Sequence, residues 1–186
     1  PEHRTTARDL ATLSVALING HPEHYKIYKE QSFTYNGTKQ YNRNSLLRSD
    51  ATVDGLKTGY TSEAGYGLVA SAQREDMRLV SVVLGSASKR TRASANSSLL
   101  NYGFRFFQNL RPLSAEVTLV EPRVWKGATE SLHAGVLESV VLTVPRERTA
   151  ADIELKVDEQ LEAPFSRGDV IGSVQVVRGG EVLFES

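Results

Sequence analysis

Three segments of strand length follow one another between residues 56 and 84, and they restrict the fold more than any other feature of this chain. The segments are residues 56–61, 67–72 and 77–84, and short polar or glycine-containing connections separate them. Connections of this length join neighbouring antiparallel strands. We therefore expect one antiparallel sheet in this part of the chain.

Helices are expected before and after these strands. Thr6 and Asp9 have the spacing of a capping box and precede leucines at helical spacing, so residues 7–19 are predicted to form an amphipathic helix. Residues 89–109 have a longer helical pattern, which Pro112 is expected to end. Helices that flank an antiparallel sheet place the first part of the chain in the α+β class.

A hairpin and a loop are expected between the first helix and the strands. Residues 32–35 alternate between polar and apolar side chains, and Asn36-Gly37 after them is a typical hairpin turn. Residues 41–52 are rich in Asn, Arg and Ser and are predicted to form a loop.

The character of the chain changes near Arg111-Pro112. Strand-like segments beyond this point alternate with Pro, Gly and charged turns, a pattern typical of a small β-sandwich. They are residues 117–120, 139–144, 153–157, 170–177 and 182–184. We predict two domains, residues 1–111 with the sheet and its helices and residues 112–186 as an all-β sandwich.

Composition excludes several classes of protein. The 186 residues include 22 basic and 22 acidic side chains, so no basic field indicates a nucleic-acid partner. No apolar segment approaches membrane-spanning length, and the absence of cysteine excludes disulfides and thiolate chemistry. The four histidines are scattered, and we expect neither a metal site nor a cofactor.

The tripeptide Lys57-Thr58-Gly59 is the strongest chemical signal. Acyl transfer by a serine needs a nucleophile, a base and donors for the developing oxyanion. On a strand, Gly59 would let a substrate backbone approach, and the Tyr60 N–H could be one oxyanion donor. Thr58 could bind a substrate carboxylate, and Lys57 could supply positive charge or relay a proton. Taken alone, the tripeptide also fits an exposed turn without function.

Several segments around the tripeptide share a further pattern. They are residues 42–47, 53–61, 64–72 and 103–107, followed by Trp125 and residues 142–146. Together they resemble the low-molecular-mass penicillin-binding proteins, the serine D-alanyl-D-alanine carboxypeptidases of peptidase family S11. The resemblance spans nearly the whole chain. It implies part of a β-lactamase/transpeptidase-like sheet, followed by the β-rich C-terminal domain of that family.

The resemblance also implies a role for one arginine. Arg92 matches the position at which the family has an arginine that holds the terminal carboxylate of the peptide, and a guanidinium suits that task. Lys89 and Arg90 are alternatives, and Arg92 could instead be a solvated helix residue. The family often has His where this chain has Tyr60, a change that leaves a backbone role intact.

The activity implied for the intact protein is removal of the terminal D-alanine from peptidoglycan stem pentapeptides, with acylation by β-lactams. Such an enzyme acts in cell-wall biosynthesis and cell shape. We expect the family's Ser-x-x-Lys and Ser-x-Asn elements to be absent from these 186 residues, and Ser62, Ser86 and Ser88 are not expected to be nucleophiles. This chain alone is therefore expected to be inactive, and to need the N-terminal half of the catalytic domain as a partner.

Two other functions remain open. The chain could be a non-catalytic interaction or positioning module in the cell envelope. A β-lactamase would share the Lys-Thr-Gly, but strand-like segments beyond Leu113 argue against one. The resemblance further implies a periplasmic location at the outer face of the bacterial inner membrane. Peripheral membrane association would use a C-terminal amphipathic helix that is not in this chain.

Overall fold

A computed structural model describes residues 4–115, 117–147, 151–158 and 161–186. The chain forms two compact units, Pro1–Phe106 and Phe107–Ser186. The predicted division after residue 111 falls inside strand β6 (Phe107–Leu113), because the chain leaves the helix before Phe107 and continues as a strand. In the described residues, no helix combines the length and the apolar character needed to cross a membrane.

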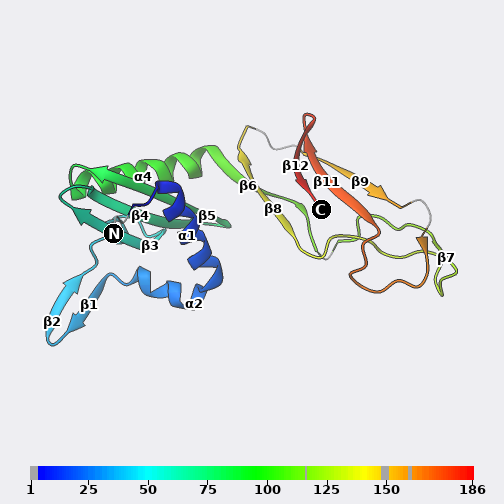
Figure 1. The fold of residues 1–186 in the computed structure, drawn as a ribbon, viewed down its shortest axis with the longest axis horizontal. Helices are drawn as coiled ribbons and strands as arrows, with labels where there is room; N and C mark the ends of the chain where they lie inside the picture. The colour runs from blue at the N-terminus through cyan, green and yellow to red at the C-terminus, as the bar shows by residue number, and fades with distance from the viewer. Residues whose placement is uncertain (1–3, 116, 148–150, 159–160) are drawn as a thin grey trace. The chain divides into compact units, whose positions relative to one another are not determined.

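The first unit is built on the three-stranded antiparallel sheet predicted from the sequence. Its strands are β3 (Val53–Thr61), β4 (Gly65–Arg74) and β5 (Met77–Ser86), in the order β3-β4-β5 (Figure 1). β4 is the central strand and contains Leu68, Ala70 and Ala72, which are almost fully buried. β3 therefore has one strand neighbour in the described part of the chain and lies at an edge of the sheet.

Helix α1 (Ala7–Gly20) covers one face of this sheet. The predicted capping box is confirmed, since the Asp9 N–H donates to Thr6 Oγ1 and the Thr6 N–H donates to Asp9 Oδ2. Apolar residues of the helix pack against a cluster formed by Tyr25, Leu56 and Val69. These helix residues are Leu10, Leu17 and Ile18.

Helix α4 (Lys89–Phe106) lies against the other face. Ser81 of β5 bonds Asn96 of α4, and the space beside Gly103 of α4 is filled by Leu79 of β5. Val80 and Val82, which alternate with these two strand residues, pack with the α1 cluster instead. The sheet is thus covered by one helix on each face.

The predicted end of α4 is wrong by three residues. The pattern favoured a helix over 89–109, but residues 107–109 belong to β6 and pair with β8 (Val140–Pro145). Pro112 lies within β6, at a register shift between Leu110 and Leu113, so it does not end the helix. Pairing with a strand distant in the sequence outweighs local helical preference here.

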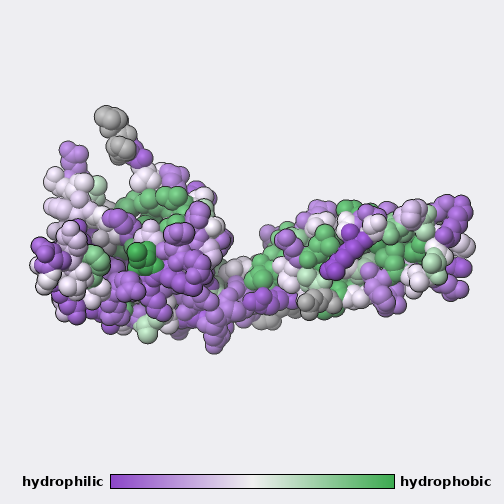
Figure 2. Space-filling view, turned by 90° about the horizontal axis from the view of Figure 1, so that it is seen from below, coloured by the Kyte–Doolittle hydropathy of each residue, from purple (hydrophilic) through white to green (hydrophobic). Residues whose placement is uncertain are grey.

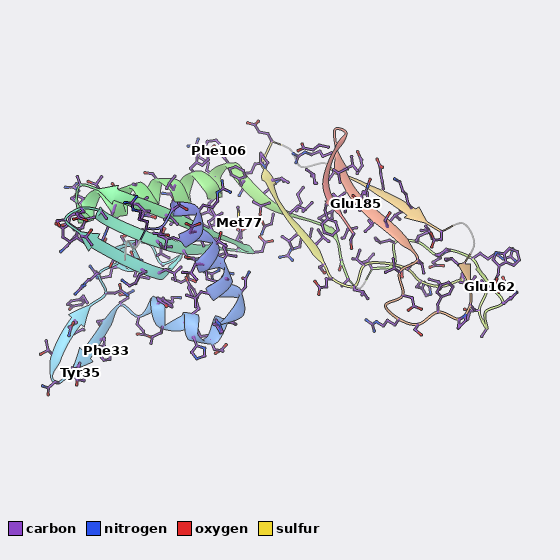
Figure 3. The ribbon with its side chains drawn as sticks, in the orientation of Figure 1. Phe33, Tyr35, Met77, Phe106, Glu162 and Glu185 are labelled. Atoms are coloured by element: carbon purple, nitrogen blue, oxygen red, sulfur yellow. The ribbon has the colours of Figure 1, made fainter. Side chains whose placement is uncertain are left out.

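The segment between α1 and the sheet contains short helices and the predicted hairpin. α2 (Pro22–Tyr25) and the 3₁₀ helix η1 (Lys26–Lys29) precede strands β1 (Ser32–Tyr35) and β2 (Thr38–Tyr41). Asn36 and Gly37 both have positive φ, as a two-residue hairpin turn requires. Phe33 and Tyr35 on this hairpin are exposed (Figure 3). Part of the predicted loop is helical, as α3 (Leu46–Ser49).

The second unit is all-β. Besides β6 and β8 it contains β7 (Val124–Trp125), β9 (Asp152–Val157), β10 (Leu161–Glu162), β11 (Gly172–Arg178) and β12 (Glu181–Glu185). β6 pairs with β8, β7 with β10, and β9, β11 and β12 form a third sheet. The predicted strand at 117–120 is reduced to a single bridge between Val120 and Ala134.

The first and third of these sheets pack on a common core, as expected for a sandwich. Leu113, Val140, Val174 and Val176 form its buried centre. Figure 2 shows hydrophobic and hydrophilic residues interspersed on the visible surface of this unit. Exposed apolar side chains such as Val170 and Leu137 agree with that picture.

Candidate active site

The Lys57-Thr58-Gly59 tripeptide lies in the middle of edge strand β3 (Figure 1). Lys57 and Gly59 are exposed and Thr58 is half-buried. The Lys57 Nζ donates a hydrogen bond of 2.6 Å to the carbonyl oxygen of Thr58, so the ammonium stays close to the strand backbone. A Cβ added at Gly59 would meet no atom within 4 Å. The tripeptide thus presents a charge and open space at the edge of the sheet.

Tyr60 follows the tripeptide and its side chain is exposed. Its ring stacks on that of Tyr66, its partner on β4, with ring centroids 4.3 Å apart. This cross-strand pair holds the Tyr60 ring against β4, although 59% of the residue stays exposed. The replacement of the family's frequent histidine is compatible with a backbone role of Tyr60.

A network of polar side chains supports the start of β3. The Tyr25 hydroxyl donates to Asp54 Oδ1 over 2.9 Å, and Arg78 forms an ion pair of 2.8 Å with Asp54 Oδ2. Burial of Tyr25 raises the pKa of its hydroxyl above the ordinary value, chiefly by desolvation. Gly55 is required beside this network, because a Cβ there would collide with the Tyr25 hydroxyl.

Asn44 holds the same end of the strand from another side. It is 1% exposed, its Nδ2 donates to the Gly55 carbonyl over 2.9 Å, and its Oδ1 accepts from the Leu46 N–H over 3.1 Å. Sequence reasoning did not identify Asn44 as a functional residue. The letters of residues 42–44 do not reveal that the Asn44 amide is buried, and only burial makes its hydrogen bonds necessary.

Arg92 contacts the site differently from the sequence expectation. It is 4% exposed, and its Nη1 donates to the carbonyl oxygens of Gly59 (3.1 Å) and Gly67 (3.0 Å). Its Nη2 donates to the Arg43 carbonyl over 3.3 Å. Burial lowers the pKa of Arg92 from its usual value by desolvation. Carboxylate binding by Arg92 stays a prediction, and the solvated-residue alternative is wrong.

The two other cationic candidates lie nearby in the sequence. Lys89 and Arg90 are exposed residues in the first turn of α4. Arg92 is the candidate whose side chain hydrogen-bonds β3, through the Gly59 carbonyl.

The family's two serine patterns do occur in the letters of the sequence, contrary to our expectation. They are Ser86-Ala87-Ser88-Lys89 and Ser94-Ala95-Asn96. Ser86 ends β5 whereas Lys89 begins α4, so this pair does not share one helical turn. Ser86 is opposite Tyr66, which is opposite Tyr60, so Ser86 is two strand spacings, about 10 Å, from Tyr60.

The Ser94 pattern also has a structural explanation. The Asn96 amide is fully buried and bonds Ser81 and the carbonyl oxygens of Leu68 and Arg92. Ser94 donates its hydroxyl to the Thr91 carbonyl. These contacts make Asn96 a core residue of the interface between helix and sheet. Neither pattern supplies a nucleophile beside Lys57.

Comparisons with known proteins match both parts of the chain. Residues 1–88 match the family model described as D-alanyl-D-alanine carboxypeptidase, and residues 107–186 match the C-terminal domain of penicillin-binding protein 5. The Escherichia coli D-alanyl-D-alanine carboxypeptidase DacC is 44% identical over 98% of this chain and 46% of its own length. The chain therefore spans about half the length of the curated relatives it matches.

Solved structures agree with these matches. Penicillin-binding protein 5 from Haemophilus influenzae has a TM-score of 0.84 and 38% identity, over 98% of this chain and 54% of its own. Penicillin-binding protein D2 from Listeria monocytogenes, solved in a cefotaxime-bound form, has a TM-score of 0.51 and 38% identity. That match covers 54% of this chain and 41% of the Listeria chain.

Proposed function

This chain belongs to the low-molecular-mass penicillin-binding proteins of the D-alanyl-D-alanine carboxypeptidase family, and we propose that it forms part of an enzyme that removes the terminal D-alanine from peptidoglycan stem peptides. The location of Lys57-Thr58-Gly59 on an exposed edge strand carries this proposal. An edge strand offers backbone groups along which an extended peptide can bind. We place the reaction in the bacterial periplasm, at the outer face of the inner membrane.

The reaction begins with a serine that this chain does not place beside the tripeptide. We assign that serine and its lysine partner to the part of the relatives that the chain does not span. The serine oxygen attacks the carbonyl carbon between the two D-alanines, the amide C–N bond breaks, and the leaving amine takes up a proton. Water then hydrolyses the ester and restores the serine.

The tripeptide and its neighbour supply the surroundings of that carbonyl. The Tyr60 N–H donates to the oxyanion that develops during attack. The Thr58 hydroxyl binds the terminal carboxylate, and Gly59 leaves room for the substrate backbone. The Lys57 ammonium favours the anionic substrate and supports proton transfer. We expect β-lactams to acylate the same serine, and penicillin-binding protein D2 from Listeria monocytogenes has been solved in cefotaxime-bound and ampicillin-bound forms.

Labelling with a fluorescent penicillin, read on a denaturing gel, tests this proposal. We expect a covalent band from the complete enzyme and none from residues 1–186 alone. The complete enzyme should also release D-alanine from a D-alanyl-D-alanine peptide, and residues 1–186 alone should not. A complete enzyme that neither labels nor releases D-alanine contradicts the proposal, and a labelled band from the chain alone contradicts the placement of the nucleophile.

A further inference from the structure

The hairpin of β1 and β2 extends away from the three-stranded sheet of the first unit (Figure 1). Its two strands pair with each other as a separate two-stranded sheet, and Ser32 is their one residue that is not exposed. A two-stranded hairpin of this kind gains little stability in water by itself. Large aromatic side chains on it contribute little to the fold and are available to a ligand.

One face of the hairpin presents two aromatic rings to solvent. Phe33 and Tyr35 are two residues apart on β1, so their side chains lie on the same face. They are 65% and 69% exposed, with ring centroids 6.4 Å apart and ring planes 13° from parallel (Figure 3). A ligand can therefore contact both rings at once.

The other side chains of this face are polar but uncharged. Gln40 on β2 is paired with Phe33, and Thr38 is paired with Tyr35, so all four side chains share one face. The amide and the hydroxyl are exposed, and both can donate and accept hydrogen bonds. This face, the Phe33–Tyr35 face, thus combines apolar rings with neutral hydrogen-bonding groups.

The opposite face of the hairpin is cationic. The Lys39 ammonium lies 5.3 Å from the ring centroid of Tyr41, and the Arg48 guanidinium lies 5.8 Å from the same centroid. Lys39 and Tyr41 alternate along β2 with Thr38 and Gln40 and therefore face the other way. An anionic partner would bind this second face and leave the Phe33–Tyr35 face free.

The chemistry of the Phe33–Tyr35 face selects a neutral ligand with flat apolar surfaces and a polar rim. An N-acetylated sugar ring has this form, because C–H groups cover its two faces and hydroxyl and acetamido groups surround it. The C–H groups can pack on the aromatic rings, and the rim can bond Gln40 and Thr38. An apolar protein surface would instead bury the two polar side chains without partners, which is costly.

We infer that the Phe33–Tyr35 face binds the glycan strand of peptidoglycan, a β-1,4-linked chain of N-acetylated sugars. The muramic acid carboxyl of this strand is neutral wherever an amide bond joins it to a stem peptide. The choice of peptidoglycan as the source of the sugar rests on the proposed function, because the stem peptides are attached to this strand. The site is separate from Lys57-Thr58-Gly59 and keeps the enzyme on its polymeric substrate between cleavages.

Calorimetric titration of the complete enzyme with a β-1,4-linked hexamer of N-acetylglucosamine tests this inference, since the hexamer has no stem peptide. We expect saturable binding, which Phe33→Ala and Tyr35→Ala should each weaken by roughly twofold to tenfold, the effect of losing one aromatic contact. Tyr41→Ala is the matched control and should keep the wild-type affinity, because Tyr41 is 63% exposed on the opposite face. All three variants should melt close to the wild-type temperature, as surface substitutions do.

Three results would overturn the inference. The first is the absence of saturable binding of the hexamer to the complete enzyme. The second is an equal loss of affinity in Tyr41→Ala, because binding would then not depend on the Phe33–Tyr35 face. The third is a large fall in melting temperature in Phe33→Ala and Tyr35→Ala, which would show that the rest of the catalytic domain covers these rings.

Kinetics separate this inference from the proposed function. On a free pentapeptide ending in D-alanyl-D-alanine, Phe33→Ala and Tyr35→Ala should release D-alanine at the wild-type rate. On the same pentapeptide attached to a glycan strand, their KM should rise by up to about tenfold. An enzyme that binds the hexamer but releases no D-alanine refutes the proposed function alone, and an active enzyme that does not bind the hexamer refutes the inference alone.

Discussion

Arg92 on helix α4 and Gly59 on strand β3 are joined by a hydrogen bond of 3.1 Å between the Nη1 and the carbonyl oxygen. They are 33 residues apart in the sequence, and the bond brings a charged donor to the strand that carries the Lys-Thr-Gly. The contacts around β3 lead to predictions that separate effects on enzyme activity from effects on the stability of the fold.

Replacement of Lys57 by alanine should reduce D-alanine release by roughly 10²-fold to 10⁴-fold in the complete enzyme, the range for loss of a proton-transfer group. Penicillin acylation should fall with it, whereas the melting temperature should change little because Lys57 is exposed. Lys39→Ala on the exposed hairpin is the matched control and should keep full activity. Equal activity of both variants would remove Lys57 from the mechanism.

Replacement of two glycines of β3 by alanine should have different effects, one on stability and the other on activity. Gly55→Ala should lower the free energy of unfolding by about 1–3 kcal/mol, because the new Cβ collides with the Tyr25 hydroxyl. Gly59→Ala should change stability by less than about 1 kcal/mol, because its Cβ would enter open space, but should slow peptide hydrolysis by obstructing the substrate. Urea denaturation and kinetics on the same samples measure both effects. A stable Gly55→Ala protein would contradict the packing argument.

Tyr25 should make stability depend on alkaline pH. Its folded-state pKa is raised above the ordinary value of 10.0, so above about pH 10 the unfolded chain releases a proton that the folded chain keeps. Stability is therefore fully present below that pH and declines as the pH rises further. In Tyr25→Phe this part of the decline should be absent, whereas Tyr35→Phe, at an exposed tyrosine, should keep it. If the free energies of unfolding of wild type and Tyr25→Phe change in parallel between pH 9 and 11, Tyr25 does not cause the decline.

Ser86→Ala should leave penicillin labelling of the complete enzyme intact to within about twofold. The residue has a lysine three positions later, but it ends β5, two strands away from β3. Gel labelling with a fluorescent penicillin measures this directly. Loss of the band would make Ser86 the nucleophile and would reverse our interpretation of that pattern.

Local sequence patterns predicted the elements of the first unit well. The capping box at Thr6 and Asp9, the Asn36-Gly37 turn and the three strands of the sheet depend on neighbours within a few residues. Those signals have a period and a turn chemistry that can be recognised without tertiary structure. The early end of α4 could not be found in this way, since β6 forms by pairing with β8 far along the chain.

The contacts of the site were less accessible from sequence. The tripeptide could be recognised as a motif, but the Asn44 bond to Gly55 and the three bonds of Arg92 join segments that come together only on folding. Short patterns also mislead: the letters of Ser86 to Lys89 match a catalytic motif, whereas the structure divides them between a strand and a helix. A match to a catalytic motif is informative only if the structure brings its side chains together.

A structure of the complete enzyme acylated by a penicillin tests the central claim most directly. We predict that the acyl carbonyl oxygen lies within about 2.7–3.1 Å of the Tyr60 nitrogen, with the Thr58 hydroxyl at the ligand carboxylate and Arg92 still bonded to Gly59. The acylated serine should belong to a segment outside residues 1–186. An acyl group bound elsewhere than along the outer edge of β3 would contradict the account.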